Sequence, residues 1–196
     1  QRLARQRRAD LARRKKEYTA TLAIMKRRGV KGLQASAGTS TGTPRRRRAP
    51  IGVPAGGAPL QLFAEGDSWF DYPAPFFGGG IVRRLENRLG VPILNLAKAG
   101  DEVRYMLGVE ERRRLIEELR DGCPAGGPWD VLLFSGGGND IVDNPMALWI
   151  REFDPALAPA AQIHTARFDA ALALVRAGYE DLIGLRDKLS PGTHLL

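Results

Sequence analysis

The sequence has little cysteine and no long apolar run, and each shortage excludes a class of protein. Its only cysteine is Cys123, so no disulfide can form within the chain. A single free cysteine is compatible with a reducing compartment. No apolar segment reaches the roughly 20 residues that a membrane-spanning helix needs. The basic N-terminus is not followed by the apolar segment of a secretory signal. We therefore expect a cytoplasmic protein without a transmembrane segment.

Acidic residues are scarce in the first part of the chain. Residues 1–50 hold 16 lysines and arginines but only two acidic residues, Asp10 and Glu17. Residues 51–196 hold 14 basic and 20 acidic residues, so the net charge of +8 belongs to the N-terminal segment. A contact with nucleic acid or an anionic surface would therefore have to be made by this segment.

This N-terminal segment predicts a helix followed by a linker. Over residues 2–28, apolar residues recur at helical spacing and form one stripe, made of Leu11, Tyr18, Leu22 and Met25. A stretch rich in Gly, Ser and Thr follows and ends in four arginines at 45–48, so we assign residues 1–49 to a basic helix and a flexible linker. Three roles remain open: binding nucleic acid or anionic lipid, pairing with a partner helix, or forming a solvated extension. We expect the extension, packing little against residues 50–196.

From residue 50 onward, apolar strand patterns alternate with helical patterns. Strands are expected near residues 60–65, 91–97, 130–135 and 193–196, and helices over 81–89, 102–119 and 166–189. Near-continuous apolar strands separated by helices predict an α/β fold with a parallel sheet and helices on both faces. In such sheets ligands bind at the carboxyl ends of the strands. A site is therefore expected in the loops after Ala64, Ala97 and Phe134.

These three loops carry residues suited to acyl transfer. Ser68 follows the first strand, Gly100 follows the second without a side chain to shield its N–H, and Asn139 follows the third. Acyl transfer needs donors aimed at the oxygen that becomes negative in the tetrahedral intermediate. The backbone N–H groups of Ser68 and Gly100 and the side-chain amide of Asn139 are three such donors. We expect them to converge at one edge of the sheet.

The three loops together resemble the conserved blocks of the SGNH, or GDSL, hydrolase family. Residues 66–68 (Gly-Asp-Ser) are similar to its first block, Gly100 to its second, and residues 137–140 (Gly-Gly-Asn-Asp) to its Gly-x-Asn-Asp block. The resemblance covers residues 58–196. It implies a flavodoxin-like three-layer α/β/α fold, hydrolysis of carboxylic esters or thioesters, and no cofactor.

The resemblance also implies a role for each residue of the site. Ser68 would be the nucleophile and the first oxyanion donor, and Gly100 and Asn139 would complete the oxyanion hole. Two neighbouring acids, Asp67 and Asp140, are expected to brace the loops and to take no part in a catalytic triad. The aromatic residues after the serine either line an acyl pocket or pack the loop, and they are Trp69, Phe70, Tyr72, Phe76 and Phe77.

The family's last block, Asp-x-x-His, supplies the general base and has no counterpart in this sequence. Of the two histidines, His194 is expected at the end of its strand opposite the site, and His164 precedes a helix as a surface residue. We therefore expect the hydrolase domain of residues 50–196 to be incomplete at its C-terminus, with the base beyond Leu196. The alternative is a non-catalytic, SGNH-like binding module that keeps the oxyanion pocket and is tethered by its basic tail.

Overall fold

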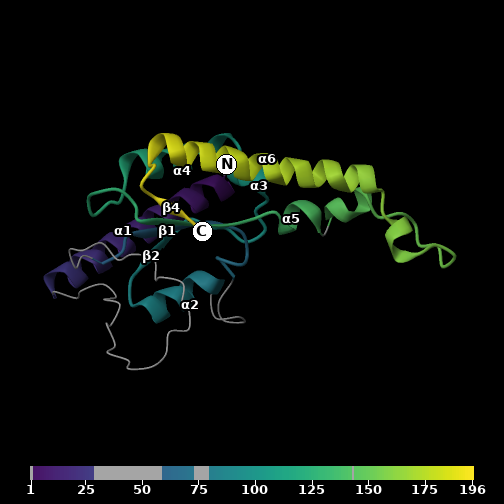
Figure 1. Ribbon diagram of the computed structural model, residues 1–196. Coiled ribbons are helices and arrows are strands. Elements are labelled where there is room, and N and C mark those ends of the chain that lie inside the picture. The colour runs from purple at the N-terminus through teal and green to yellow at the C-terminus, as the bar shows by residue number, and fades with distance from the viewer. Residues whose placement is uncertain (1, 29–58, 73–79, 143) are drawn as a thin grey trace, which may run out of the picture.

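The computed structural model describes residues 2–28, 59–72, 80–142 and 144–196 of the chain (Figure 1). At its centre is a four-stranded sheet of order β2-β1-β3-β4. The strands are β1 (Leu62–Gly66), β2 (Ile93–Asn95), β3 (Val131–Ser135) and β4 (His194–Leu195). All three pairings are parallel, which confirms the parallel sheet expected from the alternating pattern. The order 2-1-3-4 is also how the strand order of flavodoxin-like sheets begins.

Helices cover both faces of the sheet, as expected. Figure 1 shows α2 on one side of the strands and α4 and α6 on the other. The elements outside the sheet are α1 (Arg2–Arg27), α2 (Gly80–Leu89), α3 (Val103–Met106), α4 (Val109–Asp121), α5 (Gly138–Ile141), η1 (Asn144–Leu148), η2 (Pro159–Gln162) and α6 (Thr165–Leu189). No helix in the described ranges is long and apolar enough to cross a bilayer.

The helix predicted over residues 102–119 is instead two helices, α3 and α4. The break comes at Gly108, whose backbone is extended (φ −72°, ψ 175°) and which serves as the N-cap of α4. Its N–H donates to the carbonyl of Tyr105, which closes the end of α3. Glycine is unfavourable inside a helix and acceptable at a cap, so a new helix begins here at little cost.

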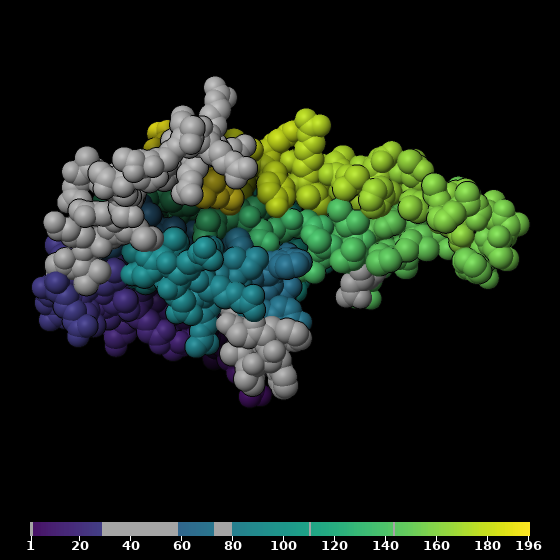
Figure 2. Space-filling model, turned by 60° about the horizontal axis from the view of Figure 1, so that its bottom comes forward, coloured from purple at the N-terminus to yellow at the C-terminus, as the bar shows by residue number. Residues whose placement is uncertain are grey.

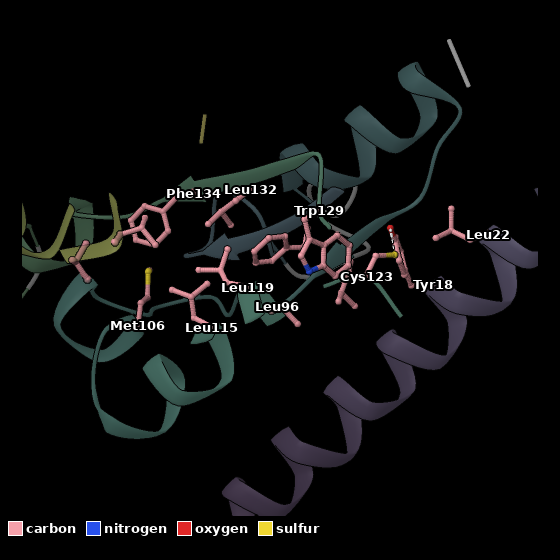
Figure 3. Close-up of a cluster of buried hydrophobic side chains, with 14 residues drawn as sticks. Tyr18, Leu22, Leu96, Met106, Leu115, Leu119, Cys123, Trp129, Leu132 and Phe134 are labelled. Carbon is pink, nitrogen blue, oxygen red and sulfur yellow. Dashed lines mark hydrogen bonds between the residues drawn. The ribbon is translucent and has the colours of Figure 1, made fainter. Parts of the chain in front are cut away.

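The two faces of the sheet bury separate apolar clusters. On the α4 and α6 side Trp129 is central, and its ring lies 4.8 Å from the ring of Phe63 and 5.6 Å from that of Tyr18 (Figure 3). The indole N–H of Trp129 donates to the carbonyl of Glu118, so its polar atom is satisfied inside the core. On the other face Val82 of α2 packs in a second cluster with side chains of β1, β2 and β3.

Helix α1 corrects the expectation that the N-terminal segment packs little against the rest of the chain. Its stripe is buried: Tyr18 and Leu22 are each 4% exposed, and both point from α1 toward Trp129 in Figure 3. Lys15 of α1 pairs with Glu118 of α4 at 2.7 Å. The stripe therefore packs against the chain's own core, and residues 2–27 are part of the folded body. The linker and the domain boundary assigned at residue 50 lie outside the described residues.

The segment between β3 and α6 projects from the body as an arm. Figure 2 shows the green and yellow-green part of the chain, which holds η1, η2 and the first half of α6, extending beyond the rest of the molecule. Within the arm, Ile150 and Ile163 form an antiparallel bridge, and the rings of Trp149 and Phe168 meet edge to face at 6.1 Å. The arm determines where His164, which immediately precedes α6, lies relative to the sheet.

Candidate active site at the carboxyl edge of the sheet

The first loop of the site begins at a glycine, Gly66, because there is no room for a side chain at this position. A Cβ atom on Gly66 would lie 2.8 Å from the carbonyl oxygen of Ser135 and 2.9 Å from the ring of Phe70. The chain then turns, and the N–H groups of Phe70 and Asp71 both donate to the carbonyl of Asp67. This turn brings Ser68 to the carboxyl end of β1, as the sequence predicts.

Asp67 fastens this turn to the end of β3. It is 3% exposed, and its Oδ1 accepts from the Ser135 hydroxyl and from the Trp69 N–H, each at 3.0 Å. The carboxylate is thus occupied by structural hydrogen bonds, in agreement with the bracing role expected for it. Ser135 was not singled out by the sequence, because a serine at a strand end has many ordinary roles.

Ser68 is half-buried and lies in an apolar groove. Its hydroxyl makes no hydrogen bond within the described residues. The groove has a volume of about 390 Å³, and its walls are Ser68, Trp69, Tyr72, Gly80, Ile81 and Arg84. Two of the five aromatic residues after the serine therefore line a cavity, whereas Phe70 is buried in the core. Phe76 and Phe77 lie outside the described residues.

The second loop follows β2 and carries Gly100. This glycine is exposed, and its φ of +84° is a left-handed conformation that other residues rarely adopt. The N–H of Lys98 donates to the carbonyl of Gly66 at 2.9 Å, which fixes the second loop against the first. Asp101 is 3% exposed and its carboxylate pairs with the ammonium of the exposed Lys98, so this ion pair closes the loop around Gly100.

The third loop follows β3 and carries Asn139 on α5. The side-chain amide of Asn139 donates to the carbonyl of Asp101 at 2.9 Å, directly beside Gly100 in the chain. An amide NH₂ has two hydrogens, so one remains for another acceptor. Asp140 accepts from the N–H of Val103 at 2.7 Å and so braces the start of α3, as expected of this residue.

The three loops therefore occur together at one edge of the sheet. They follow β1, β2 and β3, which are hydrogen-bonded neighbours running in the same direction. Hydrogen bonds join the Asn139 loop to the Gly100 loop, and both are linked to the loop of Ser68. Gly100 and Asn139 are not among the walls of the groove that contains Ser68. The groove thus adjoins the β1 loop on the α2 side.

Two arginines of α1 also hold these loops, and the sequence did not point to them. Arg7 donates to the carbonyls of Leu96 and Ala97, at the end of β2. Arg14 pairs with Asp71 in the first loop at 3.1 Å. In the sequence they look like the other arginines of a basic helix. What distinguishes them in the structure is that both are half-buried on the side of α1 that meets the body, whereas the other described arginines of this helix are exposed.

A buried carboxylate lies beneath the first loop. Glu65 is fully buried in β1, with Arg114 of α4 donating to it at 3.3 Å. Burial raises the pKa of Glu65 to about 7, and the charges of Arg114 and Arg7 oppose that rise only in part. The signal in the sequence was an acidic residue at the end of an apolar strand. Because Glu65 is enclosed, it shapes the field beneath the site and cannot contact a substrate in this conformation.

Neither histidine of the chain is in reach of Ser68. His194 pairs with Val131, the first residue of β3, so it lies about 13 Å along the strand from the carboxyl edge. Val175 of α6 packs against Gly137 near the site, and His164 precedes it by eleven residues, or about 16 Å of helix. Partial desolvation and the charges of Arg151 and Arg167 lower the pKa of His164. No general base of the imidazole type is therefore available to Ser68 from this chain.

Comparisons with known proteins give a faint likeness in structure and none in sequence. No protein-family model matches the chain, and no curated protein matches it. Among solved structures, the chain is similar to AlinE4, described as an SGNH-hydrolase family esterase, and to a mutant of that esterase. In both cases the identity is 17%, the match covers 70% of this chain and 75% of the other, and the TM-score is 0.33. This likeness is too weak for any residue to be assigned from it.

Proposed function

We propose that this chain is an acyl hydrolase of the SGNH type that cleaves carboxylic esters, with Ser68 as its nucleophile. The observation that carries the proposal is the meeting of three loops at the carboxyl edge of β1, β2 and β3. One loop offers a serine hydroxyl with no hydrogen bond among the described residues, and another offers an exposed glycine N–H. The third offers an amide with one hydrogen left to donate. Together these are a nucleophile and the donors of an oxyanion hole.

The groove beside Ser68 supports an apolar ester as the substrate. Trp69 is 65% exposed and Tyr72 is 41% exposed, and both rings border the groove with Ile81. Ligand sites are typically apolar with a few polar groups that fix orientation. An acyl chain or an aromatic acid would fill this volume, while its carbonyl carbon lies at Ser68.

Neither histidine of the chain serves as the general base in this proposal, because both are too far from Ser68. A serine hydroxyl without a base is a poor nucleophile at neutral pH. The chain alone is therefore expected to hydrolyse 4-nitrophenyl acetate hardly above the buffer rate. Removing a triad member typically costs several orders of magnitude, while the oxyanion hole alone leaves a weak remainder.

Imidazole added to the buffer tests the proposal by supplying the missing base. We expect it to raise the rate of nitrophenyl acetate hydrolysis by the chain beyond its effect on the ester alone, and Ser68→Ala to abolish that excess. Asn139→Ala should lower it at least about tenfold, since one oxyanion donor commonly contributes a hundredfold or more. Asn87→Ala, an exposed residue of α2, is the matched control and should change nothing. An excess that survives Ser68→Ala would refute the assignment of the nucleophile.

The second candidate is a binding module without catalysis. It is favoured by the distance of both histidines from Ser68 and by the use of one Asn139 hydrogen to hold Asp101. In that case imidazole would produce no Ser68-dependent excess. The carboxylate product of an apolar ester should still bind in the groove, and Trp69→Ala should weaken that binding. The Ser68-dependent excess with imidazole therefore separates the two candidates, and tryptophan fluorescence on titration with such a carboxylate measures the binding.

A further inference from the structure

A second groove, on the other side of the sheet from α2, has no part in the proposed hydrolysis. It lies between the first half of α1 and α4 and has a volume of about 520 Å³. Its walls are unusually basic, because both helices turn positively charged residues toward it and the loop after β2 adds one more. The cationic residues are Arg7, Arg8, Lys98, Arg113 and Arg114, and the rest of the wall is Leu3, Ala4, Leu11, Glu111 and Glu117.

The acids around the groove compensate only part of this charge. Arg113 pairs with Glu117 at 3.7 Å, and Lys98 pairs with Asp101. Arg8 is exposed and forms no ion pair within the described residues. The wall itself holds five cations and two acids, and Asp10, Asp101 and Glu65 pair with three of the cations from outside it. Arg8 is left as the wall cation without an acidic partner in the described residues, and its charge favours an anion there.

Two of the arginines are held close together despite their like charge. Burial and the charges of Arg114 and Arg14 lower the pKa of Arg7. Arg7 donates to neutral backbone carbonyls and lies 3.9 Å from Asp10, a carboxylate that also pairs with Arg13 and Arg14, so its charge is neutralised only in part. Arg114 donates a hydrogen bond to the buried Glu65 through one terminal nitrogen. Its Nε is also buried and has no hydrogen-bond partner among the described residues. A buried charged donor without an acceptor is costly, and the charge of an anion in the groove would offset part of that cost.

We propose that this groove binds a small, multiply charged anion of the phosphate-ester class through Arg7, Arg8 and Arg114. Guanidinium groups present several N–H donors in a planar fork that matches phosphate oxygens. A monocarboxylate would neutralise less of the excess charge than a phosphate ester does. Leu3 and Leu11 provide an apolar wall for the organic part of the ligand. Arg7 also holds the loop after β2, but Arg8 and Arg114 lie outside the three loops of the proposed active site, so the inference does not require the esterase activity.

The test is calorimetric titration of the whole chain with inorganic pyrophosphate at constant ionic strength. We expect saturable binding that Arg8→Ala weakens at least about tenfold, since a charge-assisted hydrogen bond is lost. Arg8 is exposed, so its replacement should not disturb folding. Arg88→Ala, an exposed arginine of α2 on the opposite face, is the matched control and should leave the affinity unchanged. Replacing the four arginines at 45–48 by alanine should also leave it unchanged.

Two further variants and a second probe make the outcome decisive. Glu65→Gln should tighten pyrophosphate binding several-fold, because it removes the carboxylate that competes with the anion for Arg114. Binding that is insensitive to Arg8→Ala, or that disappears with the arginines at 45–48, overturns the proposal. Phosphatidylcholine vesicles containing phosphatidic acid distinguish a lipid headgroup from a free phosphate. Arg8-dependent binding to these vesicles without binding of pyrophosphate would overturn the assignment to a small soluble ligand.

Discussion

At the scale of single residues, Gly66 shows how closely the first loop approaches the end of β3. Any Cβ at this position would press on the Ser135 carbonyl, which belongs to the backbone and cannot move aside. We predict that Gly66→Ala lowers the free energy of unfolding by about 1–3 kcal/mol, in the range of overpacked core positions. Gly184 of α6 is the matched control, because nothing lies within 4 Å of its Cβ position. Gly184→Ala should stabilise the protein by up to about 1 kcal/mol, through helix propensity. Urea unfolding of both variants measures the contrast, and a destabilised Gly184→Ala with an unchanged Gly66→Ala would contradict it.

The buried Glu65 makes a prediction about pH. Its folded pKa of about 7 lies above the ordinary value of 4.5, so the folded state holds the proton more tightly than the unfolded state. Its contribution to stability is therefore fully present below about pH 4.5 and is lost as the pH rises toward 7. Compared with Glu65→Gln, the wild-type chain should lose stability over that window by an amount on the order of 3 kcal/mol. Chemical unfolding of both proteins at several pH values measures this, and a wild-type stability that stays constant or rises with pH relative to Glu65→Gln would contradict it.

At the scale of elements, α1 is the clearest difference between expectation and structure. The sequence correctly predicts a helix with one apolar stripe, but the stripe does not reveal which surface it meets. That surface is built from Trp129 and its neighbours, a hundred residues later in the chain. Similarly, the pattern predicts a single helix over residues 102–119, because the charged face continues past Gly108 and conceals the break. Periodicity identifies which face of a helix is apolar, whereas packing partners are set by the tertiary structure.

The packing of α1 makes its own prediction. Leu22 is 4% exposed and belongs to the core around Trp129, whereas Leu3 of the same helix is 81% exposed. Leu22→Ala should lower the free energy of unfolding by about 2–5 kcal/mol, which is usual for removing a buried leucine. Leu3→Ala should have an effect within about 0.5 kcal/mol, as surface changes do. Equal effects of the two substitutions in denaturant unfolding would show that α1 does not pack as described.

At the scale of the whole molecule, the sequence predicts the scaffold better than the chemistry. Strand positions and their parallel pairing follow from apolar runs separated by helices, and this places the three loops at one edge. The links between the loops could not be predicted, because they depend on which atoms face each other after folding. The Asn139 amide donating to the Asp101 carbonyl is such a link, and so is Arg14 pairing with Asp71. The position of His164 also depends on folding, since it follows from how α6 extends into the arm.

The central claim is that Ser68 is an acyl acceptor at this edge of the sheet. Trapping the acyl group tests it most directly, because a chain without its own base should also release an acyl group slowly. After incubation with 4-nitrophenyl acetate and imidazole, peptide mass spectrometry should locate an acetyl group on Ser68. Asn139→Ala should reduce this acetylation, and Asn87→Ala should not. Acetylation confined to lysines, or an unmodified Ser68 while the exposed residues of the chain are acetylated, would contradict the account.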